Sequence, residues 1–301
     1  MATFKSWEDI FKFSTDVYEE DYVYDKDFTV KAKTTSTDKR GDYSVKISQS
    51  KPDDAGLSKN SMEIKHIEKT EGGVSHEAAY KSNGHVEAET TIPLGGYNFI
   101  SYHLFWDLHM NKPANESKFA SALTYKQKNL EAKFKVEHCN IGILNSELTF
   151  KPEKIADVTL GAETSFDYKN TKLLSYAVGL NHQLTPTFSW GTLAERGAGE
   201  KLGNYEAYFL QEVDEKTKIA ARVGHSHVEN DFRATVGVKH AVSDTATFKG
   251  KINSSGLLAL SWKQILGNGA TLTLSSALNL TDKSFVNSEP LPFGVQLEGK
   301  F

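Results

Sequence analysis

The sequence has few of the residues that build disulfide-rich, metal-stabilised or fibrous proteins. Its 301 residues contain one cysteine, Cys139, together with 7 prolines and 22 glycines. A single cysteine excludes an intrachain disulfide and a zinc site built from cysteines. The glycines are dispersed and the prolines are few, which argues against a collagen-like repeat and against long disordered segments. The chain is therefore expected to fold.

Long hydrophobic runs are also lacking. No stretch of about 18 apolar residues occurs, so the sequence predicts no transmembrane helix. The strands of a membrane β-barrel alternate apolar and polar side chains, so this lack leaves a transmembrane β-barrel open. The formal net charge of -4 argues against a dedicated nucleic-acid-binding protein.

The first 25 residues contain no arginine and no apolar core followed by a cleavage site. We therefore expect neither a secretory signal nor a mitochondrial transit peptide. Ser6 followed by Asp9 has the spacing of a helix capping box. An amphipathic helix is predicted after it, because apolar residues recur at helical spacing on one face. This apolar face comprises Trp7, Ile10, Phe11 and Val17.

From residue 27 onward the period of the apolar residues changes from 3.6 to 2. Leu272, Leu274 and Leu278 alternate with small polar residues, and the segment that starts at Phe293 behaves alike. We count about 19 such strand segments, each taking about 14 residues with its turn, which suits short membrane-crossing strands. No linker interrupts the series. The predicted organisation is a helical segment at 1–26 and one β domain at 27–301.

Two architectures could bury the apolar face of these strands. A soluble β-sandwich would need large apolar residues on the inner faces of two packed sheets. Here each strand has one apolar face, whereas the other face carries Lys, Glu, Ser, Thr, Asn or Gly. A closed barrel in lipid covers such an apolar face and leaves water inside. The pattern favours an all-β transmembrane barrel, with a large soluble β protein as the alternative.

The closing segments carry a resemblance to a known family. Residues Ala246–Trp262, Ala270–Leu278 and Phe293–Glu298 resemble the last strands of the eukaryotic mitochondrial porins, the voltage-dependent anion channels. Lys251–Ser255 is the most specific piece, and Trp7–Tyr18 is similar to the N-terminal segment of the family. The resemblance implies an antiparallel barrel of about 19 strands whose first and last strands are parallel, with the N-terminal helix inside the pore.

The sequence departs from the family pattern at several positions. The segment 19–25 between helix and barrel has no glycine, which should stiffen the connection. A Gly-Leu-Lys motif linked with nucleotide binding corresponds to Gly96–Asn98, which lacks the lysine. Glu77 has the parity of the inner face, so the lipid-facing acid of many members is expected to be absent. The C-terminal sorting signal is met only at Gly294 and Leu297.

Strand parity predicts a basic wall inside the barrel. From Lys218 onward the inward positions are mainly basic, whereas residues 1–26 contain three lysines and seven acids. We therefore expect the acidic face of the helix near this wall, its apolar stripe on the barrel, and only weak anion preference. The predicted pore-lining basic residues are Lys31, Lys33, Lys218, Arg222, Arg233, Lys239, Lys249, Lys251 and Lys263.

No enzyme chemistry is predicted. His225 and His227 share one strand face and could hold a metal, but they are better interpreted as a pair at the membrane interface. No Ser/His/Asp or paired-carboxylate arrangement stands out, and we expect no catalytic residue, cofactor or metal site.

Two functions from different classes fit the sequence. The first is a water-filled channel of the mitochondrial outer membrane, in contact with the lipid bilayer, that passes small ions, anionic metabolites and nucleotides and is gated by voltage. The second is a porin-like structural or accessory subunit of a larger mitochondrial membrane assembly, with protein partners and little conduction. A bacterial outer-membrane porin is a third, weaker idea, because a signal peptide is missing and the expected strand number is odd.

Overall fold

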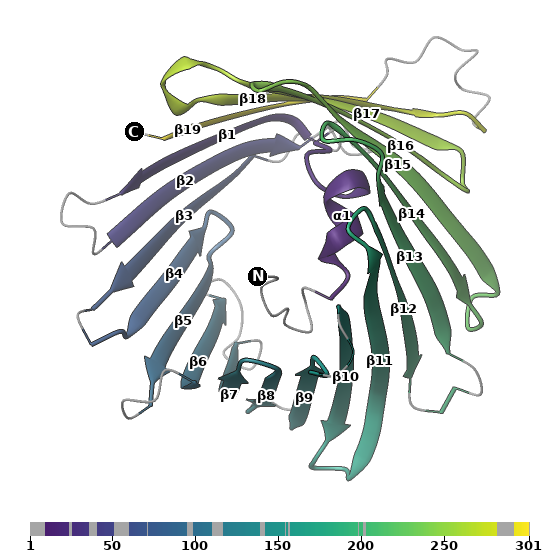
Figure 1. Cartoon of the computed structure of the whole chain (residues 1–301). Helices are drawn as coiled ribbons and strands as arrows, with labels where there is room; N and C mark the ends of the chain where they lie inside the picture. The colour runs from purple at the N-terminus through teal and green to yellow at the C-terminus, as the bar shows by residue number, and fades with distance from the viewer. Residues whose placement is uncertain are drawn as a thin grey trace.

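The structure is a closed β-barrel with a short helix inside it (Figure 1). It is a computed structural model that describes residues 10–23, 26–35, 41–50, 60–70, 72–94, 99–109, 117–138, 142–153, 155, 157–197, 199–200, 203–281 and 292–300. The 19 strands lie in one sheet. They are β1 Lys26–Thr35, β2 Gly41–Ser50, β3 Asn60–Lys69, β4 Ser75–Lys81, β5 His85–Pro93, β6 Ile100–His109, β7 Lys118–Gln127, β8 Leu130–Glu137, β9 Ile143–Phe150, β10 Val158–Asp167, β11 Lys172–Thr185, β12 Phe188–Gly197, β13 Asn204–Glu212, β14 Thr217–Ser226, β15 Asp231–Ser243, β16 Ala246–Asn253, β17 Leu257–Ile265, β18 Thr271–Asn279 and β19 Phe293–Lys300.

The barrel is a meander that closes between its two ends. Each strand pairs antiparallel with its neighbours in the chain, so all odd-numbered strands run in the same direction. Because the strand number is odd, β1 and β19 must meet in parallel, and their register runs from Phe28↔Val295 to Lys33↔Lys300. The prediction of 19 strands with parallel first and last strands is confirmed.

The period of 2 in the sequence becomes the two faces of the wall. On β17 the outward side chains Leu260 and Trp262 are 44% and 37% exposed, whereas the inward Ala259 and Ser261 lie buried beneath the N-terminal segment. An apolar outer face and a polar inner face are what a barrel in lipid requires. The register is therefore fixed, since a slip by one residue would exchange the faces.

The helix α1 spans Lys12–Tyr18 and contacts β13, β14, β15 and β16 from inside the ring (Figure 1). It begins later than predicted, because Ile10 and Phe11 are not helical. The amide nitrogen Nδ2 of Asn181 donates to the carbonyl of Ile10 at 2.5 Å, so this non-helical residue is bound to the wall at β11. The predicted capping box at Ser6 and Asp9, together with Trp7, lies outside the described residues.

No helix among the described residues is long and apolar enough to cross a membrane.

Candidate functional site: the contact between the helix and the basic wall

The basic wall brings like charges together on neighbouring strands. Lys239 on β15 stands directly opposite Lys249 on β16, and Lys263 follows on the inner face of β17. Like charges in cross-strand pairs destabilise a sheet unless something neutralises them. This wall therefore needs acids on the segment that covers it.

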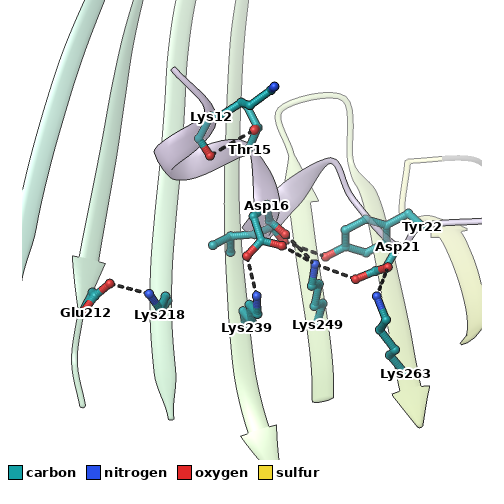
Figure 2. Close-up of polar contacts among 11 residues, drawn as sticks. Lys12, Thr15, Asp16, Asp21, Tyr22, Glu212, Lys218, Lys239, Lys249 and Lys263 are labelled. Carbon is teal, nitrogen blue, oxygen red and sulfur yellow. Dashed lines mark hydrogen bonds and ion pairs between the residues drawn. The ribbon is translucent and has the colours of Figure 1, made fainter. Parts of the chain in front are cut away.

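Two aspartates of the N-terminal segment supply that charge (Figure 2). Asp16 forms an ion pair with Lys239, and its Oδ1 lies 2.9 Å from Nζ of Lys249. Asp21 bridges the next two lysines, with 2.9 Å to Lys249 and 2.8 Å to Lys263. We call these five residues, Asp16, Asp21, Lys239, Lys249 and Lys263, the lysine clamp.

Lys249 is the central residue of the lysine clamp. Its side chain is 2% exposed, against 39% for Asp16 and 16% for Asp21. Besides both carboxylates, Nζ donates to the backbone carbonyl of Asp16 at 2.6 Å. That carbonyl lies in the last turn of α1 and lacks an intrahelical partner, and a cation at a helix C-terminus is favoured by the helix dipole. Lys249 thus satisfies the helix end and both acids at once.

The electrostatics of the lysine clamp follow from burial and pairing. Burial alone raises the pKa of the Asp16 carboxyl, but hydrogen bonds and charges from Lys239 and Lys249 hold that pKa well below its usual range. The pKa of Asp21 is also lowered, since Lys249 and Lys263 outweigh its burial. Both carboxylates are therefore ionised at neutral pH, where the lysine clamp persists.

The segment that connects the helix to the barrel lies along the wall. Asp21 has a φ of 65°, a left-handed conformation that glycine adopts at least cost. The Oγ of Ser261 donates to the carbonyl of Asp21 at 2.7 Å, and the amide of Val23 donates to Oγ of Ser275 at 2.8 Å. Nζ of Lys251 lies 4.2 Å from the ring centre of Tyr22, a cation–π contact. A connection without glycine is thus held by contacts on β16, β17 and β18.

Apolar contacts fix the other side of the helix. Ile10, Val17 and Tyr18 are buried, and Phe11 stacks on Tyr208 of β13 with ring centres 4.7 Å apart. Burial raises the pKa of the Tyr18 hydroxyl to about 12. A Cβ added to Gly237 of β15 would lie 3.0 Å from Cβ of Tyr18, so glycine lets the helix approach the wall closely.

Other predicted basic residues pair at the edges of the helix contact. Arg222 on β14 contacts Glu206 and, at 3.3 Å, Glu19 just after the helix. Lys218 pairs with Glu212 near the strand end and is drawn beside the lysine clamp in Figure 2.

The remaining predicted residues are paired within the barrel wall. Arg233 lies 2.8 Å from Asp231, close to the turn that precedes β15. On β1, Lys33 lies 2.7 Å from Glu298 of β19, and Lys31 stands opposite Glu298 in the register of the closing pair. Arg222 and three of the predicted lysines therefore pair with acids of the N-terminal segment. Roles of all these residues in conduction remain predictions.

The wall across the lumen carries acids, lysines and histidines. His103 lies 3.0 Å from Glu89, and His85 contacts Asp107. Lys118 of β7 lies beside these acids. The acids and Lys118 line a cavity of about 360 Å³ together with Glu77, Glu87, Phe105, Lys135 and Glu137. Lysines of this wall pair with several of these acids, as Lys65 does with Glu77, and Lys135 lies 3.6 Å from Glu137. This wall is therefore mixed in charge, unlike the basic wall under the helix.

The two histidines singled out in the sequence lie together without further ligands. The rings of His225 and His227 are 4.4 Å apart. Within the part of the chain that the structure describes, no group of three or more His, Cys, Asp or Glu side chains could hold a metal ion.

A closed 19-strand barrel with an apolar outer face, a charged lumen and a helix held inside defines a porin-type membrane barrel. The model of the eukaryotic porin family matches residues 5–288. The chain belongs to the eukaryotic porin family.

Curated relatives and solved structures agree with this family. The chain is 25% identical over 138 residues to a voltage-dependent anion-selective channel of Drosophila melanogaster, a match that covers 46% of each protein. It is 27% identical over 122 residues to the mitochondrial outer membrane protein porin of Candida albicans, covering 40% of this chain and 42% of the relative. The chain thus spans about half the length of these relatives. A mutant porin of Rh. blastica matches with a TM-score of 0.51 at 8% identity, covering 81% of this chain and 94% of the porin, which shows the fold alone.

Proposed function

We propose that this protein is a water-filled channel of the mitochondrial outer membrane that passes small ions and metabolites. The observation that carries the proposal is the closed barrel whose lumen is lined by charged side chains and whose only described insert is one short helix. The names of the Drosophila and Candida relatives support both the channel activity and the location. The segment 1–26 is the insert and 27–301 the channel wall, in which no residue acts as a catalyst.

The lysine clamp supports weak anion preference. Three of the predicted pore-lining lysines pair with aspartates of the N-terminal segment, and Arg222 pairs with two glutamates. Paired charges contribute little to the potential along the pore, because partners at hydrogen-bonding distance largely cancel each other's field farther away. Salt screens what remains beyond a Debye length of about 8 Å. Anionic metabolites and nucleotides in transit therefore meet a nearly balanced lumen. The proposal includes voltage gating, because the Drosophila relative is named a voltage-dependent anion-selective channel.

Planar-bilayer recording of the purified protein tests this function. We expect step currents of the size of a wide aqueous pore, in the absence of any cofactor. Heat-treated protein serves as the control for leaks from detergent or aggregates. A correctly folded barrel that gives no steps would overturn the proposal.

A second candidate is an accessory subunit of a larger mitochondrial membrane assembly. The fixed connection favours it, because the segment lacks glycine and is held by Ser261, Ser275 and the lysine clamp. Such an insert would not move in response to voltage. The second candidate is supported if the folded barrel is silent in bilayers and co-purifies with fixed amounts of partner proteins from mitochondria.

A further inference from the structure

The outer surface of the barrel has a groove over β12 and β13. Its volume is about 630 Å³, and its floor consists of small side chains, Thr192, Ala194 and Ala207. Register places Thr192 opposite Ala207 and Ala194 opposite Tyr205. All of these positions share the outward parity of their strands, so the groove faces the hydrocarbon of the bilayer rather than the lumen.

Larger side chains form the sides of this groove. Val178 and Leu180 of β11 stand beside the floor on one side, and Val223 of β14 and Phe232 of β15 stand on the other. Val178 and Phe232 are 51% and 57% exposed, so they project from the wall. A narrow apolar groove between projecting side chains can hold a linear hydrocarbon chain.

The groove ends near one arginine and two histidines at one rim of the barrel. β12 and β14 end there, at Gly197 and Ser226, and β13 begins there. His225 lines the groove opposite Tyr205, and the His227 ring packs edge-on against Tyr205 at 5.8 Å. Arg196 of β12 has outward parity at the same rim, and its Nε donates to the carbonyl of Glu200 at 2.6 Å.

One polar side-chain atom at this end of the groove is unpaired among the described residues. Nδ1 of His225 is buried and has no hydrogen-bond partner among the described residues. Buried polar atoms in folded proteins are almost always hydrogen-bonded, so this atom is a candidate contact for a polar ligand group. The Arg196 guanidinium at this rim favours an anion, and phosphate matches the guanidinium geometry. An imidazole N–H can donate a hydrogen bond to a phosphate oxygen.

We propose that this groove is a binding site for one glycerophospholipid, with an acyl chain over Ala194 and Ala207 and the phosphate at His225, His227 and Arg196. The apolar floor and the cationic rim match the two ends of such a lipid. This site does not depend on conduction, because it lies on the face of the wall opposite to the lumen.

Photolabelling in nanodiscs tests the site. The full chain is reconstituted in phosphatidylcholine with a trace of phosphatidylglycerol that carries a diazirine on one acyl chain, and labelled peptides are mapped by mass spectrometry. We expect label on β11–β14, loss of it with Ala207→Trp, which fills the floor, and retention with Ala132→Trp. Ala132 is the matched control, since it has outward parity on β8 opposite Tyr125 and Leu148.

A second variant tests the phosphate end. His225→Phe combined with His227→Phe keeps the groove apolar but removes the hydrogen-bond donors, so labelling from phosphatidylglycerol should be lost. Heat-modifiable gel mobility confirms that each variant forms the barrel. The proposal is overturned by label spread evenly around the barrel, or by equal labelling of Ala207→Trp and wild type. In competition with unlabelled lipids, displacement of the probe by a sterol but not by phospholipid would also overturn it.

Discussion

Replacing Lys249 by methionine removes the ammonium group at the centre of the lysine clamp and keeps a side chain of similar length. In the wild type this group donates to the Asp16 carbonyl at 2.6 Å and lies 2.9 Å from carboxylate oxygens of both Asp16 and Asp21. The substitution leaves the helix end without its donor and leaves each aspartate with one lysine.

The size of the effect follows from burial. Removing one partner of a fully buried ion pair costs about 3–5 kcal/mol. Asp16 is 39% exposed, and Lys239 and Lys263 stay in place, so we discount the cost to about 2 kcal/mol of helix docking. That free energy corresponds to a shift of roughly 30-fold between docked and undocked helix.

Hydrogen exchange of residues 10–23, measured by mass spectrometry in nanodiscs, reports the docking equilibrium. We expect these amides to exchange up to about 30-fold faster in Lys249→Met than in the wild type. Lys218→Met is the matched control, because it removes the same charge from the same wall but from a lysine that pairs with Glu212. Equal exchange in the two variants would refute the idea that the lysine clamp holds the helix.

Three further predictions address the connection, the pH range and the faces of the wall. Asp21→Asn should speed hydrogen exchange of residues 19–23, because it removes the charge that binds two lysines. Asp21→Gly should speed it further, although glycine relieves a φ of 65° that costs an L-residue about 1 kcal/mol. Unchanged exchange in both variants would show that the carboxylate is dispensable. Because the pKa values of Asp16 and Asp21 are lowered in the docked state, their stabilisation is complete above the ordinary value of 3.8 and declines as pH falls through the lowered values. Exchange corrected for its intrinsic pH dependence should thus stay constant from neutral pH to about 4 and rise below it, and a rise between pH 7 and about 5 would contradict the assignment. At the centre of β7, Leu123→Arg should cost about 2–4 kcal/mol in barrel stability. The neighbouring Thr124→Arg points into the lumen and should cost about 1 kcal/mol or less, because it meets only the like charge of Lys133 on β8. Equal losses in a urea titration would reverse the assignment of faces.

The strands could be predicted from the sequence because lipid outside and water inside impose a period of 2 on every segment. The parallel closure came from the family resemblance and an odd number of strands. The start of the helix could not be predicted, since a side chain 171 positions away, Asn181, binds the carbonyl of Ile10. Local periodicity contains no information on such a contact.

Parity predicted that Lys239, Lys249 and Lys263 point inward, but not that they converge on two aspartates. Convergence depends on the register between β15, β16 and β17 and on the place where the helix docks. Gly237 was the available signal, because a glycine on the inner face of a strand often marks a close approach. The outer groove was also hidden, since it arises from small residues that are adjacent only after β12 and β13 pair.

The reversal potential in a salt gradient tests the account of the pore most directly. The measurement compares the full chain with a variant carrying Asp16→Asn and Asp21→Asn, which frees the lysines of the clamp without removing any part of the helix. The account predicts a small reversal potential of anion-preferring sign for the full chain and a larger one of the same sign for the variant. Strong anion preference in the full chain, or identical potentials for both proteins, would contradict it.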